Sequence, residues 1–462
     1  MASGAEVRVV AAIRVPLLRR SPPHLEQIPL SLFDVWFLPQ PPIQRLFLYD
    51  DDGGGGGADD YFPSLVESLR SSLADAVAVF FPLAGKLTYV PSTGDVVVDC
   101  SPSAVGDGVA FLEAESDGDA RALSAAKRHD VPAFLRLVPS LEAPELPAPV
   151  LAVQVTRFVG GGDRGGVAVG VAVHHAVADG LSFWRFMDVW SAAARGRPSP
   201  PAPVFDRSAI VHPMAADVAR RILRKVTPEL PLVISIFVCA RVHFRRKFIK
   251  SHRIGHIKNR IAELDEATTA SPGTERRPRR LPSTFVAVAA LVWSSVVRAR
   301  ASRQPDDGAR AHLVFPADCR RRLDPPVDAA YFGNCVRCCV AGAAAGDLAD
   351  AHRGVLHARE AIREAIDGFL EHPMVEAFDA WIDAVAALVR QPGFVAVTAS
   401  PRFQVYEVDL GWGAPSRVEF ASESLPNGMV AMTAGRKEAS VQVMATLRPE
   451  HMEAFRSQLL YW

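Results

Sequence analysis

A histidine and an aspartate four positions apart form the first pair in this sequence whose types and spacing suit acid–base chemistry. His175 and Asp179 lie in HHAVADG, directly after the apolar run GVAVGVAV. A neutral imidazole has an unperturbed pKa of about 6.5, so it can take a proton from a hydroxyl at neutral pH. His175 is therefore a candidate general base. A histidine at a strand end is more often structural, however, and the neighbouring His174 is a second candidate.

Asp179 has two interpretations that the sequence leaves open. Its carboxylate could orient the histidine loop through a buried hydrogen bond. It could instead cap the helix that the apolar residues from Leu181 onward predict, because aspartate is a favoured N-cap residue. Both interpretations leave the proton transfer to His175.

A second candidate motif, Asp409-Leu-Gly-Trp-Gly413, follows the run FQVYEV far along the chain. Gly411 and Gly413 flank Trp412, a pattern that favours a tight turn with close backbone approach. Asp409 is either an acid–base residue or one half of a structural salt bridge. We favour the salt bridge, with Arg320 in ADCRRRLDPP as its candidate partner, because an aspartate at the edge of a glycine turn has no evident route to a substrate.

The surrounding patterns predict an α/β protein. A glycine-rich turn separates residues 151–159 from 166–175 and indicates a hairpin that ends at the histidines. Helical spacing marks residues 65–81, 281–299, 351–370 and 374–389, and strand-like alternation marks 6–16, 95–99, 403–410, 416–420, 428–434 and 439–446. The proline-rich stretch at 197–208 suggests a linker. We therefore predict domains at 1–196 and 216–462, joined by a crossover linker at 197–215.

Composition excludes several classes of protein. The 462 residues carry 51 Lys+Arg and 51 Asp+Glu, so no net charge favours nucleic acid or an anionic membrane. The apolar run at 230–240 is well short of the roughly 20 residues that span a bilayer. Six cysteines are too few for a disulfide scaffold, and the group at 335, 338 and 339 lacks further zinc ligands, so we expect buried thiols. These features predict a cytoplasmic protein without a metal, and the lack of a coiled-coil pattern favours a monomer.

Taken together, HHAVADG (174–180) and DLGWG (409–413) resemble the HxxxD and DFGWG hallmarks of the plant BAHD acyltransferase family, with Leu410 in place of the usual phenylalanine. FFPLAGKL (80–87) and the helix 281–299 resemble further segments of that family. YFGNC (331–335) resembles the signature of its branch that acylates anthocyanin and flavonoid glycosides, often with malonyl-CoA.

This resemblance implies two chloramphenicol-acetyltransferase-like domains, each a mixed β-sheet with helices, and an active-site channel between them. It implies an acyl-CoA cosubstrate, a small hydroxyl acceptor and no bound cofactor. Asp179 would orient the loop, and Ser283 and Thr284 would lie near the CoA, although both also suit a helix N-cap.

The function so implied is malonyl or similar acyl transfer from CoA to a flavonoid, anthocyanin or phenolic glucoside, with His175 as base. The alternatives are hydroxycinnamoyl transfer to another phenolic or alcohol, and a noncatalytic family member that acts as a protein partner.

Overall fold

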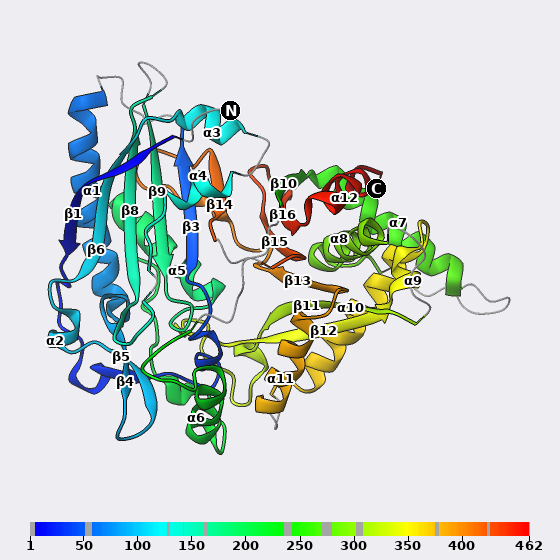
Figure 1. The fold of residues 1–462 in the computed structure, drawn as a ribbon, viewed down its shortest axis with the longest axis horizontal. Helices are drawn as coiled ribbons and strands as arrows, with labels where there is room; N and C mark the ends of the chain where they lie inside the picture. Colours follow the sequence, from blue (N-terminus) through cyan, green and yellow to red (C-terminus); the bar gives the residue numbers. More distant parts are fainter. Residues whose placement is uncertain are drawn as a thin grey trace. The chain divides into compact units, whose positions relative to one another are not determined.

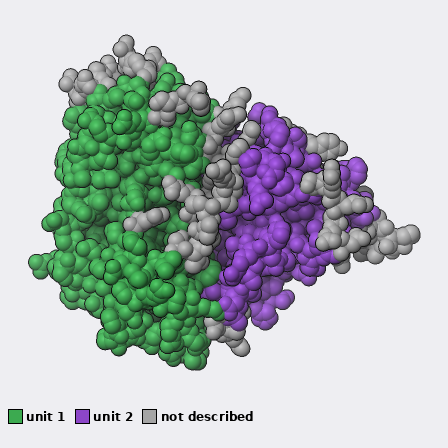
Figure 2. Space-filling view, viewed as in Figure 1, with its two compact units in different colours: residues 1–238, 323–336, 405–424 green, residues 239–322, 337–404, 425–462 purple. Residues whose placement is uncertain are grey.

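The computed structural model describes residues 5–50, 58–126, 130–141, 143–160, 165–234, 243–269, 280–301, 308–374, 378–422 and 426–461. Contacts divide the chain into two compact units, coloured separately in Figure 2. Unit 1 comprises residues 1–238, 323–336 and 405–424, and unit 2 comprises residues 239–322, 337–404 and 425–462.

Unit 1 is built on a six-stranded mixed sheet, whose strands lie side by side in Figure 1. Its order is β1 (Val7–Val15), β6 (Val109–Ser116), β8 (Leu151–Phe158), β9 (Gly166–Val173), β3 (Ile43–Tyr49) and β14 (Arg417–Phe420). Strands β6 and β8 are parallel and all other neighbours are antiparallel. Every residue of β9 is buried, as its unbroken apolar sequence predicts for a central strand.

The two faces of β3 serve different purposes because side chains alternate along a strand. Leu46 and Leu48 pack in a cluster with Phe134 and Leu137 on one face. On the opposite face, Phe47 meets Trp184 of helix α5 (Gly180–Ala194) edge-on, with 6.1 Å between the ring centroids. Helix α5 thus packs against β3, and it begins shortly after the histidines that follow β9.

The rest of unit 1 surrounds this core. A small antiparallel sheet has the order β2 (Gln27–Pro29), β5 (Asp95–Asp99), β4 (Lys86–Val90) and β7 (Ala148–Pro149). Helix α1 (Ala58–Val79) packs against α5. The remaining helices are α2 (Pro102–Val105), α3 (Ala120–Ala125), α4 (Val131–Leu135) and α6 (Ala215–Val226), with the 3-10 turns η1 (Pro23–Leu25), η2 (Val35–Phe37), η3 (Phe81–Ala84), η4 (Arg207–Ala209) and η6 (Val405–Glu407).

Unit 2 has its own six-stranded mixed sheet. The order is β10 (His243–Ile249), β16 (Val441–Leu447), β15 (Met429–Ala434), β13 (Phe394–Thr398), β11 (Arg310–Asp318) and β12 (Val336–Ala344). Helix α8 (Thr284–Arg300) is almost wholly buried and contacts the helices around it. The helices that contact α8 are α7 (Ser251–Thr269), α9 (Ala345–Ala349), α10 (Gly354–Glu371) and α12 (Pro449–Tyr461). The unit also contains α11 (Phe378–Val389) and the 3-10 turn η5 (Arg320–Arg322). In the described part of the chain, no helix is long and apolar enough to cross a membrane.

The contacts place the domain boundaries differently from the sequence prediction. Residues 405–424, which include DLGWG, belong to unit 1 because β14 pairs with β3 from Arg417 opposite Leu48 to Phe420 opposite Arg45. Residues 323–336 belong there too, where Tyr331 bridges Val204. A division by position along the chain misses segments that return to an earlier sheet.

Two local predictions also need correction. The predicted linker at 197–208 packs within unit 1: Phe205 is buried, and the backbone at Val204 pairs with the backbone at Ala330 and Phe332. The predicted strand at 403–410 is instead the 3-10 turn η6, in which the consecutive residues Val405 and Tyr406 are both buried.

Candidate functional site

The loop after β9 separates the roles of its two histidines. His174 is built into the turn: its backbone N–H donates to the Val150 carbonyl, and its Nδ1 accepts the Ala176 N–H at 3.2 Å. Burial, followed by the neighbouring His175, lowers the pKa of His174 to about 3. Its side chain is therefore occupied in holding the loop, which leaves His175 as the candidate base.

The imidazole of His175 lies flat against Phe37 of η2, with ring centroids 4.1 Å apart and an interplanar angle of 8°. Burial is the main reason that the pKa of His175 falls to about 4, and the positive charge of Arg45 acts in the same direction. Its own carbonyl, Asp179 and the Asn334 side chain act in the opposite direction. The ring is half-buried and neutral at pH 7, which is the form that accepts a proton.

Asp179 caps a helix, which is one of the two roles that the sequence left open, and it also accepts a buried hydrogen bond from another segment. It is the N-cap of α5, where its Oδ1 accepts the Ser182 N–H at 2.9 Å. Its Oδ2 accepts the Cys335 N–H at 3.1 Å. The side chain is 1% exposed, so these contacts hold a buried carboxylate at the base of the histidine loop.

The segment YFGNC contacts the first turn of α5 at a second point. The Ser182 hydroxyl donates to the Gly333 carbonyl at 3.0 Å and accepts the Gly333 N–H at 3.1 Å. A Cβ at this glycine would lie 2.7 Å from Cζ of Arg207, so a side chain there would force the guanidinium to move. The segment resembled a substrate-class signature in the sequence, and its contacts in the structure are with the loop that carries the base.

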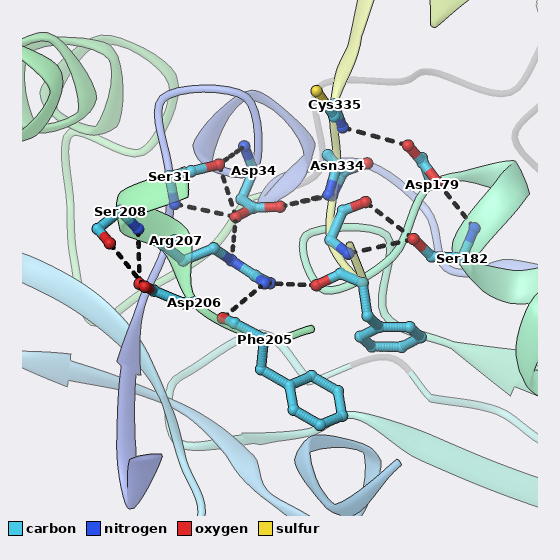
Figure 3. A network of polar contacts seen from close by, with 12 residues as sticks. Ser31, Asp34, Asp179, Ser182, Phe205, Asp206, Arg207, Ser208, Asn334 and Cys335 are labelled. Atoms are coloured by element: carbon cyan, nitrogen blue, oxygen red, sulfur yellow. Dashed lines mark hydrogen bonds and ion pairs between the residues drawn. The ribbon is translucent and has the colours of Figure 1, made fainter. Parts of the chain in front are cut away.

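Asp34 is the centre of the polar network drawn in Figure 3. It is fully buried, and its Oδ1 accepts the Asn334 backbone N–H at 2.8 Å and the Asn334 Nδ2 at 3.0 Å. Its Oδ2 accepts from Ser31 and from Nε of Arg207 at 3.0 Å. Residues three apart eclipse in a 3-10 turn. From η2, Asp34 contacts Asn334 and Phe37 stacks on His175.

Arg207 comes from the stretch that the sequence suggested was a linker. Its guanidinium donates to Asp34 and to the Phe205 carbonyl (Figure 3). It also donates to the Phe332 carbonyl and lies 5.2 Å from the centroid of the Tyr331 ring. A buried carboxylate needs such a partner, since a lone buried charge is strongly destabilising. The proline-rich stretch at 197–208 therefore holds YFGNC in place through the contacts of Arg207.

Asn334 links this network to the loop that carries His175. Its Nδ2 donates to the His175 carbonyl at 2.9 Å as well as to Asp34, and the residue is fully buried. Sequence reasoning missed Asn334, Asp34 and Arg207 as site residues. YFGNC was the one available signal, and it named a family branch without indicating a contact.

DLGWG forms a turn held by its own backbone hydrogen bonds, next to the C-terminal end of α5. Asp409 Oδ1 accepts the N–H groups of Gly411 and Gly413, both at 2.9 Å, and these glycines have φ of +114° and +100°. The Ser191 hydroxyl donates to the Asp409 carbonyl at 2.7 Å. At about 1.5 Å of rise per residue, α5 carries Ser191 about 18 Å away from Asp179. Asp409 is therefore remote from the base.

The neighbours of Asp409 differ from the predicted one. Its Oδ2 lies 4.0 Å from Nη1 of Arg195, whereas Arg320 lies in unit 2 with its Nη1 2.9 Å from Asp318. The Asp409–Arg320 pairing stays a prediction. Trp412 packs edge-on against Tyr49, whose hydroxyl donates to the Val408 carbonyl, so the motif is fastened to β3.

The predicted CoA residues lie at the start of α8 in unit 2. Ser283 is exposed and is the N-cap, where its Oγ accepts the Val286 N–H at 3.2 Å, and Thr284 is the first helical residue. Among the described residues, no group of three His, Cys, Asp or Glu could hold a metal ion. Cys335 and Cys339 are buried free thiols and Cys338 is half-buried.

Comparisons with known proteins agree with this architecture. Residues 19–460 match the model of the Transferase family. The BAHD acyltransferase DCR of Arabidopsis thaliana is 32% identical over 441 residues, which cover 93% of this chain and 87% of that protein. The chain belongs to the BAHD acyltransferase family. It is accordingly an acyltransferase, as the motifs predicted.

This BAHD acyltransferase is also similar to a characterised relative and to a solved structure. It is 29% identical over 446 residues to the malonyl-coenzyme:anthocyanin 5-O-glucoside-6'''-O-malonyltransferase of Salvia splendens, covering 93% of this chain and 90% of the relative. The crystal structure of vinorine synthase superposes with a TM-score of 0.71 at 20% identity, covering 99% of this chain and 98% of that one. The predicted fold class, two chloramphenicol-acetyltransferase-like domains with mixed sheets, is confirmed.

Proposed function

We propose that this BAHD acyltransferase moves a malonyl or similar acyl group from CoA to a hydroxyl of a flavonoid, anthocyanin or phenolic glucoside. The observation that carries the proposal is a neutral, half-buried imidazole at His175, on a loop held by the buried carboxylate of Asp179. The similarity to a malonyltransferase supports the donor and the acceptor class.

In the proposed mechanism His175 acts as general base and then as general acid. Its free imidazole nitrogen removes the proton of the acceptor hydroxyl while the oxygen attacks the thioester carbonyl. The tetrahedral intermediate expels the CoA thiolate, which takes the proton from the imidazolium, so the imidazole ends neutral. General base catalysis contributes about 10²–10⁴-fold, and holding both reactants together contributes further.

A positive charge near the base favours malonyl over hydroxycinnamoyl as the acyl group. Arg45 is close enough to His175 to lower its pKa, and its guanidinium lies 3.6 Å from the centroid of the Phe420 ring. Burial lowers the pKa of Arg45 to about 9, so it stays cationic at pH 7. A malonyl group carries a carboxylate that such a cation can bind, whereas a hydroxycinnamoyl group offers no negative charge.

The CoA contacts are proposed by resemblance. Ser283 and Thr284 stand where exposed hydroxyl and helix-start amide groups can bind an anionic group. Ser283→Ala should raise KM for the acyl-CoA with little change in KM for the acceptor. A rise in both KM values, or in neither, would oppose this placement.

The deciding experiment is a donor and acceptor screen with the purified full chain. Malonyl-, acetyl- and coumaroyl-CoA are each offered with several flavonoid, anthocyanin and simple phenolic glucosides, and products are identified by mass. We expect malonyl-CoA to give the highest kcat/KM and Arg45→Met to reduce that preference over acetyl-CoA. Preference for coumaroyl-CoA would replace this proposal with hydroxycinnamoyl transfer, and no turnover with any donor would favour a noncatalytic partner. The cytoplasmic location and the monomeric state stay predictions, which cell fractionation and light scattering test.

A further inference from the structure

Phe37 presents the face of its ring to the imidazole of His175. The two centroids lie 4.1 Å apart, and the ring planes are within 8° of parallel. Other ring pairs around α5 meet edge-on: Phe47 meets Trp184 at 88°, and Phe183 meets the same indole at 87°. An aromatic ring is negative on its face and positive at its edge. The part of Phe37 that lies against the imidazole is therefore the part that attracts a positive charge.

The imidazole becomes positive during the proposed reaction, when it takes the proton of the acceptor hydroxyl. Burial, the main influence on the pKa of His175, disfavours that charge. A cation within about 6 Å of a ring centroid is attracted to the face of the ring, and this charge would form at 4.1 Å. The attraction is strongest once the charge is present, so it stabilises the transition state more than the resting enzyme. A contact of this kind raises the rate of the chemical step.

The charged groups around the imidazole act in opposite directions. Arg45, on β3, opposes protonation, whereas Asp179, whose carboxylate accepts two backbone N–H groups, favours it. His174 is neutral at pH 7, because burial lowers its pKa to about 3. Asn334 acts through a neutral amide, and Asp34, at the start of η2, is held in an ion pair of its own. The face of Phe37 thus adds a stabilisation that brings no further charge into the site.

We propose that Phe37 is a positioning residue with two effects on the base: it holds the plane of the imidazole, and its π-face stabilises the positive charge that His175 gains during acyl transfer. The proposal rests on the proposed function, since that reaction is what charges the ring. An aliphatic side chain of similar size can hold the plane but cannot bind the charge. The two effects can therefore be measured separately.

Stepwise fluorination of the Phe37 ring tests the effect on charge by itself. The full chain is made with 4-fluoro-, 3,5-difluoro- or 3,4,5-trifluorophenylalanine at this position, which keeps the ring nearly the same size and weakens its negative face in steps. We expect kcat at pH 7 to fall with each fluorine, by up to about 30-fold over the series. The same series at Phe111, which is fully buried in β6, is the control and should leave kcat unchanged. A kcat that does not depend on the number of fluorines, or that falls equally in the control, would overturn the proposal.

The pH profile of Phe37→Leu gives the second measurement. Leucine keeps an apolar side chain against the imidazole and removes the π-face. The charged form of His175 then loses a contact, so its pKa should fall and the acid limb of kcat/KM should move down by about 0.4–1.5 pH units. Arg45→Met removes a positive charge and should move the same limb upward. Thermal melts check that both variants fold, and an acid limb that stays or rises in folded Phe37→Leu would contradict the proposal.

An NMR titration separates the failure of this proposal from the failure of the proposed function. Spectra of the chain labelled with ¹³C-histidine are recorded from pH 7 downward, and a spectrum of His175→Ala identifies the signal of His175. We expect a lower pKa of His175 in Phe37→Leu and in the trifluorinated protein than in the wild type. Equal pKa values would refute the role of Phe37 even in an active transferase. A wild-type protein without turnover on any donor would refute the proposed function, and the titration would still test Phe37.

Discussion

The two ends of helix α5 carry the two hallmark motifs, and they differ in what their aspartates hold. At the N-terminal end, Asp179 is 1% exposed and ties the helix cap to the N–H of Cys335. At the C-terminal end, the side chain of Asp409 is 29% exposed and accepts the N–H groups of its own turn. Asp179 thus ties the start of α5 to the segment YFGNC, whereas Asp409 fixes the turn of DLGWG beside the end of α5.

The difference favours separate roles for the two motifs, one beside the candidate base and one in the packing of α5. About 18 Å of helix separates them. Phe37 and Asn334 contact His175, and Asp34 and Arg207 in turn support Asn334, whereas DLGWG is not among these contacts. The four predictions that follow test this separation.

Removal of the base should have the largest effect. We expect His175→Ala to lower kcat by about 10²–10⁴-fold, because that is what a general base contributes. The fold should be retained, since the side chain is half-buried and stacks on one ring. Turnover is measured by product mass with the preferred donor. Wild-type kcat in a folded His175→Ala protein would end the assignment of the base.

Asp179→Asn should damage both stability and activity. An amide presents N–H toward a backbone N–H that the carboxylate now satisfies, and a buried unsatisfied donor costs about 1–3 kcal/mol. Urea unfolding measures the loss, and kcat should fall with it because the loop is no longer held. A variant as stable as the wild type would contradict the clamp between α5 and Cys335.

At the other end of α5, Asp409→Asn should change little. The amide oxygen can still accept from Gly411 and Gly413, and the partly exposed ion pair with Arg195 contributes about 0–1 kcal/mol. Asp409→Ala removes both backbone hydrogen bonds and should be less stable than Asp409→Asn. Neither change should move the pH profile of kcat/KM, and loss of the acid limb in Asp409→Asn would restore a catalytic role.

Besides reducing the preference for malonyl-CoA, Arg45→Met should shift the pH dependence, and this shift is the smallest of the four expected effects. Arg45 lowers the pKa of His175, so its removal should raise that pKa and move the acid limb of kcat/KM upward by less than about one pH unit. Arg8→Met is a matched control, because Arg8 is exposed and pairs with Glu115. A downward shift, or the same shift in the control, would contradict the electrostatic coupling.

Local patterns predicted what local geometry decides. The hairpin before the histidines, the helix after them and the glycine turn of DLGWG each depend on neighbouring residues, and all three occur in the structure. The two interpretations of Asp179 could not be separated from sequence, since one carboxylate has room for both hydrogen bonds.

The support of the base could not be predicted in the same way. Asp34, Arg207 and Asn334 lie in three distant segments, none with a regular periodicity, and only the folded chain brings them together. Proline content made residues 197–208 look like a linker because composition reports backbone stiffness and says nothing of the contacts that the backbone makes. The return of residues 405–424 to the first sheet was also missed, because the pairing of β14 with β3 joins residues that are far apart in the sequence.

The stacking of His175 on Phe37 has a stereochemical consequence. The lone pair of an imidazole nitrogen lies in the plane of the ring, and this plane runs nearly parallel to the phenyl face, at 8°. In the proposed reaction, the acceptor hydroxyl therefore reaches the imidazole at the edge of the ring, beside the face of Phe37. A hydroxyl on an exocyclic CH2 of a sugar can swing into that plane by rotation about one bond, whereas a ring hydroxyl must bring the whole pyranose with it.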